Sequence, residues 1–363
     1  MFDFLIVGSG LFGATFAWRA KRMGKRCLVL ERRHHTGGNL HCEDVEGIHV
    51  HRYGPHIFHT DSREVWDFVN SFVPFNRFTY SPLACYRGKL YNLPFNMNTF
   101  HQLWGVTTPE EARARMGARP DGAANLEERA IARVGRELYE TLIRGYTEKQ
   151  WGRSCTELPA AIVDRLTVRF TYDNNYFEDR FQGIPIGGYN KLIDGLLAGV
   201  EVRTDTDFFD DRASWEAQTE KIVYTGPLDR YFDYRLGRLE WRTVSLQQET
   251  LQIPNYQGVA AVNYTEREVP FTRIIEHKHF EMFGEEVYRC PVTVISREYP
   301  AAYRPGLEPF YPVTDLRNNA LADRYRALAA QEKRVLFGGR LAEYKYYDMA
   351  PIVEKVLHLD LGD

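Results

Sequence analysis

Three glycines near the N-terminus have the spacing with which a backbone binds a pyrophosphate. Gly8, Gly10 and Gly13 form a G-x-G-x-x-G pattern that follows an apolar run and opens a helix-forming segment. In such a pattern the first glycine makes the turn, the second lets the backbone approach the phosphates and the third lets helix and strand pack closely. The helix N-terminus adds unpaired N–H groups and the positive end of the helix dipole. The spacing predicts a dinucleotide site, and the alternative is a glycine-rich turn without a ligand.

An acidic residue follows the second apolar run, where the ribose of a bound dinucleotide is expected. Glu31 comes directly after residues 27–30. Its separation from Gly13, the last glycine of the pattern, is close to the roughly 20 residues at which a carboxylate accepts ribose hydroxyls. Arg32, next in the chain, could contact phosphate or adenine. Gly38 and Asn39 form a second glycine segment that permits close approach of a ligand. We therefore expect a strand–helix–strand unit that binds a dinucleotide, unless this second segment is only a surface loop.

A third glycine turn lies near the C-terminus. Residues 335–340 read as a strand that ends in two glycines and Arg340, and Asp348 is expected to cap a C-terminal helix with Pro351 in its first turn. A second helix N-terminus beside the fold's glycine loop would stabilise negative charge on an electron-rich ring. A site built from both the N-terminal glycine loop and this C-terminal turn favours FAD over NAD alone.

Histidines and arginines supply further groups that could serve a site. His56 and His59 follow a Gly-Pro turn, and they are either site residues or hydrogen-bonded turn residues. Arg165 and Arg169 lie four residues apart beside a proline-bounded segment. Such a pair forms either a mobile anion clamp or the solvated face of a helix.

The composition predicts a folded, soluble protein. The chain has 363 residues, of which 44% are hydrophobic and 26% charged, so two or three domains are expected. A net charge of −3 argues against nucleic-acid binding. The chain has no apolar run near the ~18 residues of a membrane span. Five scattered cysteines without C-x-x-C predict reduced thiols in the cytoplasm, and the absence of H-E-x-x-H argues against a metal site.

Changes in periodicity along the chain indicate its organisation. Alternating patterns flank a turn at residues 87–89, the pattern becomes helical from about 98 to 150, and residues 240–310 are rich in strands. The expected fold class is α/β, with a Rossmann-like FAD-binding domain, an inserted small helical domain and an antiparallel β-sheet domain. The expected domains are a discontinuous FAD-binding domain (1–80, 190–238 and 328–363), a helical domain (81–160), and a mobile loop with the antiparallel sheet (161–189 and 239–327).

Several motifs, in order and almost from end to end, resemble bacterial UDP-galactopyranose mutase. They are Gly-Pro-His-Ile-Phe-His-Thr at 54–60, Gly-Tyr-Thr-Glu-Lys-Gln-Trp at 145–151, Arg-Leu-Thr-Val-Arg at 165–169, Tyr-Asp-Asn-Asn-Tyr-Phe at 172–177, Tyr-Thr-Gly-Pro at 224–227 and Phe-Gly-Gly-Arg-Leu-Ala-Glu-Tyr-Lys-Tyr-Tyr-Asp-Met at 337–349. The resemblance implies a cytoplasmic isomerase of cell-wall polysaccharide biosynthesis that interconverts UDP-galactopyranose and UDP-galactofuranose without net redox. In this reaction N5 of reduced FAD attacks the anomeric carbon and UDP leaves. An external reductant such as NAD(P)H and a homodimer are also implied.

The same resemblance assigns roles to individual residues. Arg165, Arg273 and His56 would be catalytic, and the two arginines would hold the diphosphate. The residues expected to bind substrate are Tyr146, Trp151, Tyr176, Asn263, Tyr311 and Tyr346. The residues expected to bind the cofactor are Gly8, Gly10, Phe12, Gly13, Glu31, Arg32, Gly38, Asn39, His56, Ile57, Arg340, Asp348 and Met349.

The chain departs from the family pattern at the expected nucleotide pocket. Leu142 and Ile143 stand where phenylalanines are common, and Thr167 replaces a proline of the mobile loop. Related mutases act on N-acetylated or deoxy sugars, and the surroundings of His59 are one place where such specificity could be set. An FAD-dependent oxidoreductase of amine-oxidase type and a non-catalytic nucleotide-sugar-binding protein remain alternatives.

Overall fold

A five-stranded parallel sheet carries the N-terminal glycine loop. The computed structural model describes residues 1–117, 122–164 and 166–361. The strands of this sheet, in spatial order, are β16 (Val335–Phe337), β10 (Thr219–Tyr224), β1 (Phe2–Val7), β2 (Cys27–Leu30) and β9 (Glu201–Arg203). Every neighbouring pair is parallel, so segments far apart in the sequence return to one sheet. This confirms the predicted α/β class.

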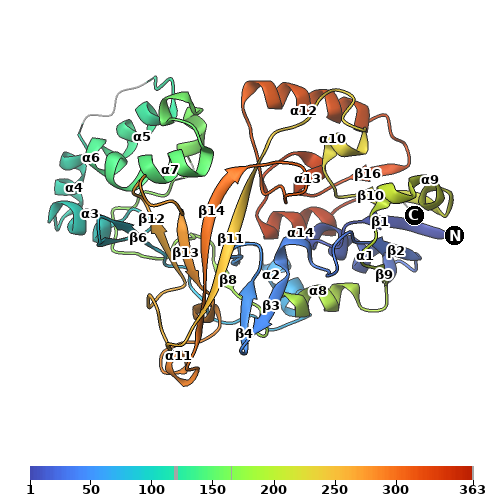
Figure 1. Cartoon of the computed structure of the whole chain (residues 1–363), viewed down its shortest axis with the longest axis horizontal. Helices are drawn as coiled ribbons and strands as arrows, with labels where there is room; N and C mark the ends of the chain where they lie inside the picture. Colours follow the sequence, from blue (N-terminus) through green and yellow to red (C-terminus); the bar gives the residue numbers. More distant parts are fainter. Residues whose placement is uncertain (118–121, 165, 362–363) are drawn as a thin grey trace.

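Helices cover both faces of this sheet, as a parallel sheet requires. On one face α1 (Leu11–Arg22) packs against α8 (Tyr189–Leu197) and α14 (Met349–Leu357) in a shared hydrophobic core. On the other face lie α9 (Arg212–Ala217), α10 (Leu228–Tyr231), α12 (Leu316–Ala329) and α13 (Arg340–Glu343). The two layers bury β1 from both sides and hold the loop after it in place (Figure 1).

A seven-stranded sheet forms the middle of the molecule. Its spatial order is β15 (Tyr311–Pro312), β11 (Trp241–Leu251), β14 (Thr293–Ala302), β13 (Arg273–Glu276), β12 (Ala261–Tyr264), β6 (Leu83–Tyr86) and β7 (Lys89–Asn92). All neighbouring pairs are antiparallel except β12 with β6. The hairpin predicted around residues 87–89 is confirmed, because Arg87 and Gly88 have positive φ angles of 50° and 74° between β6 and β7.

Helices cover the end of the seven-stranded sheet that lies farther from the parallel sheet (Figure 1). They are α3 (Met97–Trp104), α4 (Pro109–Met116), α5 (Leu126–Val134), α6 (Arg136–Leu138) and α7 (Arg144–Trp151), with a π-helical turn at Tyr139–Ile143. Thr108 and Glu111 form a reciprocal capping box at the start of α4, with Pro109 at its first position. These helices share a core with Ala84 and Tyr91 of the hairpin.

Short elements join the parallel sheet, the seven-stranded sheet and the helices at its far end. They are β3 (Cys42–Val45) paired with β4 (Ile48–His51), β5 (Phe58–Thr60) paired with β8 (Phe181–Gly183), α2 (Arg63–Asn70), α11 (Glu286–Arg289) and 3₁₀ turns at Gly38–Leu40, Cys155–Glu157, Ala160–Val163, Phe208–Asp210 and His277–Phe280. Ser62 caps α2, and its side chain accepts a hydrogen bond from the Val65 N–H.

We propose that the chain divides into the three units expected from its sequence. The hairpin of β6 and β7 belongs to the sheet by its hydrogen bonds and to the helical unit by its core, so it joins the two. Within the described residues, no helix is long and apolar enough to cross a bilayer.

Candidate active site

A cavity of about 820 Å³ lies along the carboxyl ends of β1, β2 and β10. This edge is where parallel α/β sheets bind nucleotides. Among the predicted cofactor residues, those that line the cavity are Gly8, Gly10, Phe12, Gly13, Glu31, Arg32, Gly38, Asn39, His56, Arg340 and Met349. Ile57 and Asp348 instead line a second cavity, described below.

The glycine loop leaves room for a phosphate group. A Cβ on Gly10 would have no atom within 4 Å, whereas a Cβ on Gly13 would lie 2.0 Å from the carbonyl oxygen of Gly8. Gly13 is therefore needed for helix–strand packing, and Gly10 faces open space at the start of α1. No side chain caps α1 at Gly10, so the first N–H groups of this helix remain available to an anion. The loop fits the pyrophosphate of a dinucleotide.

The C-terminal glycine turn packs against this loop. A Cβ on Gly338 would lie 2.0 Å from the Phe12 ring, so only glycine permits this contact. Asp348 occupies the N-cap position of α14, and Pro351 lies in the first turn of the helix, as predicted. The Asp348 side chain makes no capping hydrogen bond, which corrects the expectation that it would cap the helix end directly.

Glu31 is buried and held by donors of the chain itself. Its Oε2 accepts hydrogen bonds from the Ser9 N–H and Oγ at 3.0 and 2.7 Å, and its Oε1 accepts from the Arg33 N–H at 3.0 Å. These three bonds orient the carboxylate at the edge of the cavity, while the predicted ribose contact stays a prediction. Sequence reasoning missed Ser9, which occupies a variable position of the glycine pattern.

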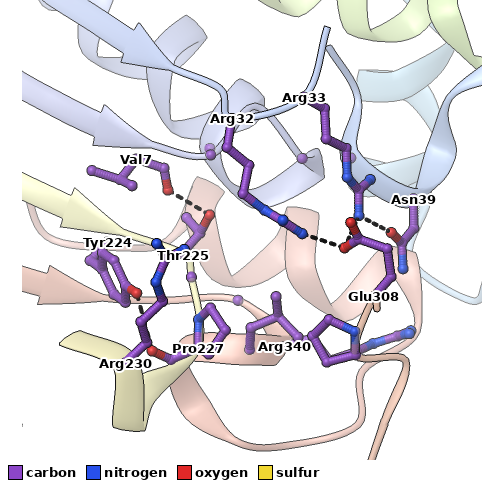
Figure 2. Close-up of a pocket in the computed structure, with 18 of the residues that line it drawn as sticks. Val7, Arg32, Arg33, Asn39, Tyr224, Thr225, Pro227, Arg230, Glu308 and Arg340 are labelled. Carbon is purple, nitrogen blue, oxygen red and sulfur yellow. Dashed lines mark hydrogen bonds and ion pairs between the residues drawn. The ribbon is translucent and has the colours of Figure 1, made fainter. Parts of the chain in front are cut away.

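The two arginines after Glu31 meet a carboxylate from a distant segment (Figure 2). Arg32 and Arg33 each place Nη2 beside Oε2 of Glu308, at 2.5 and 2.6 Å, and Arg33 also donates to Asn39 Oδ1 at 3.0 Å. Although burial alone would raise it, the pKa of Glu308 is held below its usual value by the guanidinium groups of Arg33 and Arg32. Residues 305–309, between β14 and β15, thus form part of the cavity wall.

A second cavity of about 320 Å³ adjoins the first. His56, Arg340 and Met349 line both cavities and mark their junction. The predicted substrate residues that line the second cavity are Tyr146, Tyr176, Asn263, Tyr311 and Tyr346, and the predicted catalytic residue Arg273 lines it as well. Trp151 does not line it. Instead Trp151 borders a further cavity of about 240 Å³ that shares Tyr311 and Tyr346 with the second.

Arg273 presents a buried positive charge to the second cavity. Its Nη2 lies 2.9 and 3.1 Å from the carboxylate oxygens of Glu298. Despite the opposing effect of burial, Glu298 and nearby tyrosines keep the pKa of Arg273 well above its ordinary value. Asn263 pairs with Arg273 across β12 and β13. Within the described part of the chain, Arg273 Nε and Asn263 Oδ1 are buried without a hydrogen-bond partner, as expected where a polar ligand binds.

Tyrosines surround this charge. Burial raises the pKa of Tyr311 to about 12 and that of Tyr146 further still, so both phenols stay protonated and can donate to an anion. Tyr311 stacks with Tyr346 at a centroid distance of 6.0 Å, and the Arg340 guanidinium lies 4.7 Å from the Tyr346 centroid. Tyr80, which sequence reasoning missed, also lines the cavity and lies beside Arg273.

The two predicted histidines have different surroundings. Burial, followed by the charge of Arg340, lowers the pKa of His56 to about 3, so its imidazole is neutral near pH 7. His59 stacks on Phe177 at 3.7 Å, and its Nδ1 lies 2.7 Å from Asp179 Oδ2. Both line the second cavity, while a site role for His59 stays a prediction.

The predicted arginine pair is only partly described. Arg165 lies outside the described residues. Arg169 does not lie on a helix, and its guanidinium pairs with Asp173 and Glu178 at 3.1 and 3.2 Å. For Arg169 the alternative of a solvated helix face is therefore wrong, and its charge is already partnered. Arg165 remains a prediction for the anion clamp.

Comparison with known proteins agrees with this arrangement. A family model for UDP-galactopyranose mutase matches residues 141–346, and one for an NAD(P)-binding Rossmann-like domain matches residues 6–72. A probable UDP-galactopyranose mutase of Klebsiella pneumoniae is 36% identical over 98% of this chain and 93% of its own. A dTDP-fucopyranose mutase of Escherichia coli is also 36% identical, over 97% of this chain and 96% of its own.

A solved structure supports the same fold. The crystal structure of a reduced UDP-galactopyranose mutase matches with a TM-score of 0.72 at 15% identity, over 100% of this chain and 97% of the other. At this identity the likeness shows the fold alone. The family model spans more than half of the chain, and a relative 36% identical covers nearly all of it. The chain therefore belongs to the UDP-galactopyranose mutase family of flavin-dependent isomerases.

Proposed function

We propose that this chain interconverts UDP-galactopyranose and UDP-galactofuranose. The observation that carries the proposal is the junction at His56, Arg340 and Met349, where a cavity suited to a dinucleotide meets one suited to an anionic ligand. A dehydrogenase site does not need a buried arginine ringed by protonated tyrosines. A leaving diphosphate, which must be held during reaction in both directions, does need such a group.

FAD fits the first cavity. Gly10 and the N-terminus of α1 would hold its pyrophosphate, and Glu31 would accept ribose hydroxyls. When bound and reduced, the flavin supplies a nucleophilic nitrogen for the anomeric carbon of the sugar. The two-cavity arrangement supports placing its reactive end beside His56 and Arg340. We also propose an external reductant such as NAD(P)H, and a homodimer, as the family resemblance implies.

The chain's own groups would act on the substrate diphosphate. Arg273 would hold the diphosphate from the sheet side, and Tyr311 and Tyr346 would line it. Because Glu298 fixes the Arg273 guanidinium, this charge is in place before substrate binds and needs little reorganisation. Arg165 would complete the clamp, and the aromatic pocket of Tyr146 would receive the uridine.

We expect the ion pairs of Glu308 with Arg32 and Arg33 to slow the release of FAD. Glu308→Gln should release FAD about tenfold faster, because a partly buried charge-assisted bridge is lost and Arg33 is left without its anion. The release rate can be measured from the rise in flavin fluorescence. Glu249→Gln is the matched control, since Glu249 pairs with Arg297 on the same sheet away from the cavity. Equal release rates in the two variants would contradict this role.

A panel of nucleotide sugars tests the proposed function. We expect the purified protein to bind FAD and, after dithionite reduction, to convert UDP-galactofuranose to UDP-galactopyranose with no stoichiometric reduced product. Chromatography resolves the two forms. Turnover that requires an electron acceptor would instead indicate an amine-oxidase-type oxidoreductase. UDP binding without turnover by the reduced, FAD-loaded protein would indicate a binding protein.

A second candidate substrate has a deoxy sugar. The Escherichia coli relative named for dTDP-fucopyranose is as similar to this chain as the Klebsiella relative named for UDP-galactopyranose. The second cavity is bordered by the aliphatic side chains of Leu142 and Ile143, which an added thymine methyl can contact. The panel should therefore include dTDP-fucopyranose and an N-acetylated UDP-sugar, and the ratio of kcat/KM values decides between them.

A further inference from the structure

A chain of buried histidines connects the seven-stranded sheet to the turn at the cavity junction. His277 Nε2 lies 2.8 Å from Ser296 Oγ on β14. The Nδ1 of His277 accepts a hydrogen bond from the His51 N–H at 3.2 Å, and the Nδ1 of His51 accepts one from the His56 N–H at 3.2 Å. His51, His277 and Ser296 are all buried, and none of them lines the two cavities.

These contacts define the tautomer of each ring. An imidazole nitrogen that accepts a hydrogen bond carries no proton, so the proton of the neutral ring is on the other nitrogen. His277 therefore donates from Nε2 to Ser296, and His51 also carries its proton on Nε2. Burial lowers the pKa of His277 to about 3 and that of His51 well below its ordinary value, which keeps both rings neutral.

The backbone carbonyl of His56 is also hydrogen-bonded. The Tyr189 hydroxyl, at the start of α8, donates to the His56 carbonyl at 2.9 Å. The His51 ring stacks on Phe280 at a centroid distance of 4.5 Å and meets the Tyr189 ring edge-on at 5.6 Å. Buried side chains from β4 and α8 thus satisfy both polar groups of His56, a residue that lines both cavities.

We propose that His51 and His277 are positioning residues for the mutase reaction, and that they act through the backbone N–H of His56. The acceptor nitrogens of the two rings place the Gly54–His56 turn, and with it the His56 imidazole, against the reactive end of the cofactor. This inference rests on the proposed function. Loss of the His51 acceptor would leave the His56 N–H without its partner and move the turn. A displacement of about 1 Å at a reacting centre can lower a rate by on the order of 100-fold.

Paired amide substitutions test the inference. Asn places its Oδ1 where His has Nδ1, whereas Gln places its amide where His has Nε2. We expect kcat of His51→Gln to lie about tenfold or more below that of His51→Asn. KM for the nucleotide sugar should agree within about twofold. The flavin absorption spectrum and midpoint potential should shift in the Gln variant. His277→Asn and His277→Gln should follow the same order.

Two further variants separate positioning from folding. His279 lies in the same 3₁₀ turn as His277, but its Nε2 faces Asn255 and Glu276 and lies outside the chain of histidines, so His279→Gln should keep the wild-type flavin spectrum. Tyr189→Phe removes the donor to the His56 carbonyl and should shift the spectrum even if the Gln variants do not fold.

The outcomes distinguish this inference from the proposed function. Equal kcat values and equal flavin spectra in the Asn and Gln variants would overturn the inference, as would an unchanged spectrum in Tyr189→Phe. Wild-type protein that turns over no nucleotide sugar would overturn the proposed function. The spectral difference between the Asn and Gln variants would then still test whether the histidines position the turn.

Discussion

Replacing Arg273 by Ala should lower kcat/KM for the nucleotide sugar by about 100- to 1000-fold, the loss expected when a buried charged donor to a developing anion is removed. Its guanidinium lies in the second cavity with Nε unpartnered and Nη2 held by Glu298. The affinity for UDP alone should fall as well, because the diphosphate is the group that we propose Arg273 holds. Steady-state assays with the reduced enzyme and calorimetric titration with UDP measure the two effects.

Stability must be separated from binding in this experiment. Arg273→Ala leaves Glu298 buried without its partner, which should cost about 3–5 kcal/mol of folding free energy. Arg273→Lys keeps a positive charge beside Glu298 but loses the planar fork, so it should fold better and still bind UDP poorly. Arg297→Ala, at the neighbouring exposed pair with Glu249, is the matched control and should retain kcat/KM. Wild-type UDP affinity in folded Arg273→Ala would refute the assigned role.

Replacing Gly10 by Ala should give a folded protein that does not retain FAD. The φ of Gly10 is −63° and a Cβ there meets no atom, so alanine fits the apoprotein without strain. The added methyl would occupy the space that the pyrophosphate needs. Overpacking of this kind costs about 1–3 kcal/mol, or roughly a tenfold to hundredfold loss of FAD affinity. Flavin content after purification and the dissociation constant on reconstitution measure the loss.

Gly13→Ala is the variant with which Gly10→Ala should be compared. A Cβ at Gly13 would lie 2.0 Å from the Gly8 carbonyl oxygen, so β1 and α1 would have to separate. Its melting temperature should fall in the apoprotein itself, whereas that of Gly10→Ala apoprotein should stay at or slightly above the wild-type value. Full FAD occupancy in Gly10→Ala would show that the pyrophosphate does not lie over this loop.

The nucleotide fold could be predicted because its determinants are local. Gly8, Gly10 and Gly13 define a turn within six positions, and the strand, helix and acid that follow are read from adjacent residues. The α4 cap at Thr108 and the hairpin turn at Arg87 were predictable for the same reason. In each case the conformation depends on neighbours in the chain.

The substrate half of the site could not be derived from spacing. Arg273, Tyr146 and Tyr311 come from β13, α7 and β15, and their roles were expected only from the family resemblance. The sequence does not show that Glu298 anchors Arg273, or that Trp151 borders a different cavity from Tyr146. Such facts depend on how the strands of the second sheet are ordered.

The cofactor cavity also depends on contacts between residues far apart in the sequence. Arg33 and Glu308 are 275 positions apart, and nothing in either segment predicts that they pair. Nor does the pattern of histidines predict that His277 holds His51 and that His51 holds the His56 turn. Short-range steric and hydrogen-bonding rules suffice to define the nucleotide-binding unit. The meeting of the two cavities, the pairing of distant charges and the tautomers of buried rings arise only when packing brings remote segments together, where most buried polar groups find a partner.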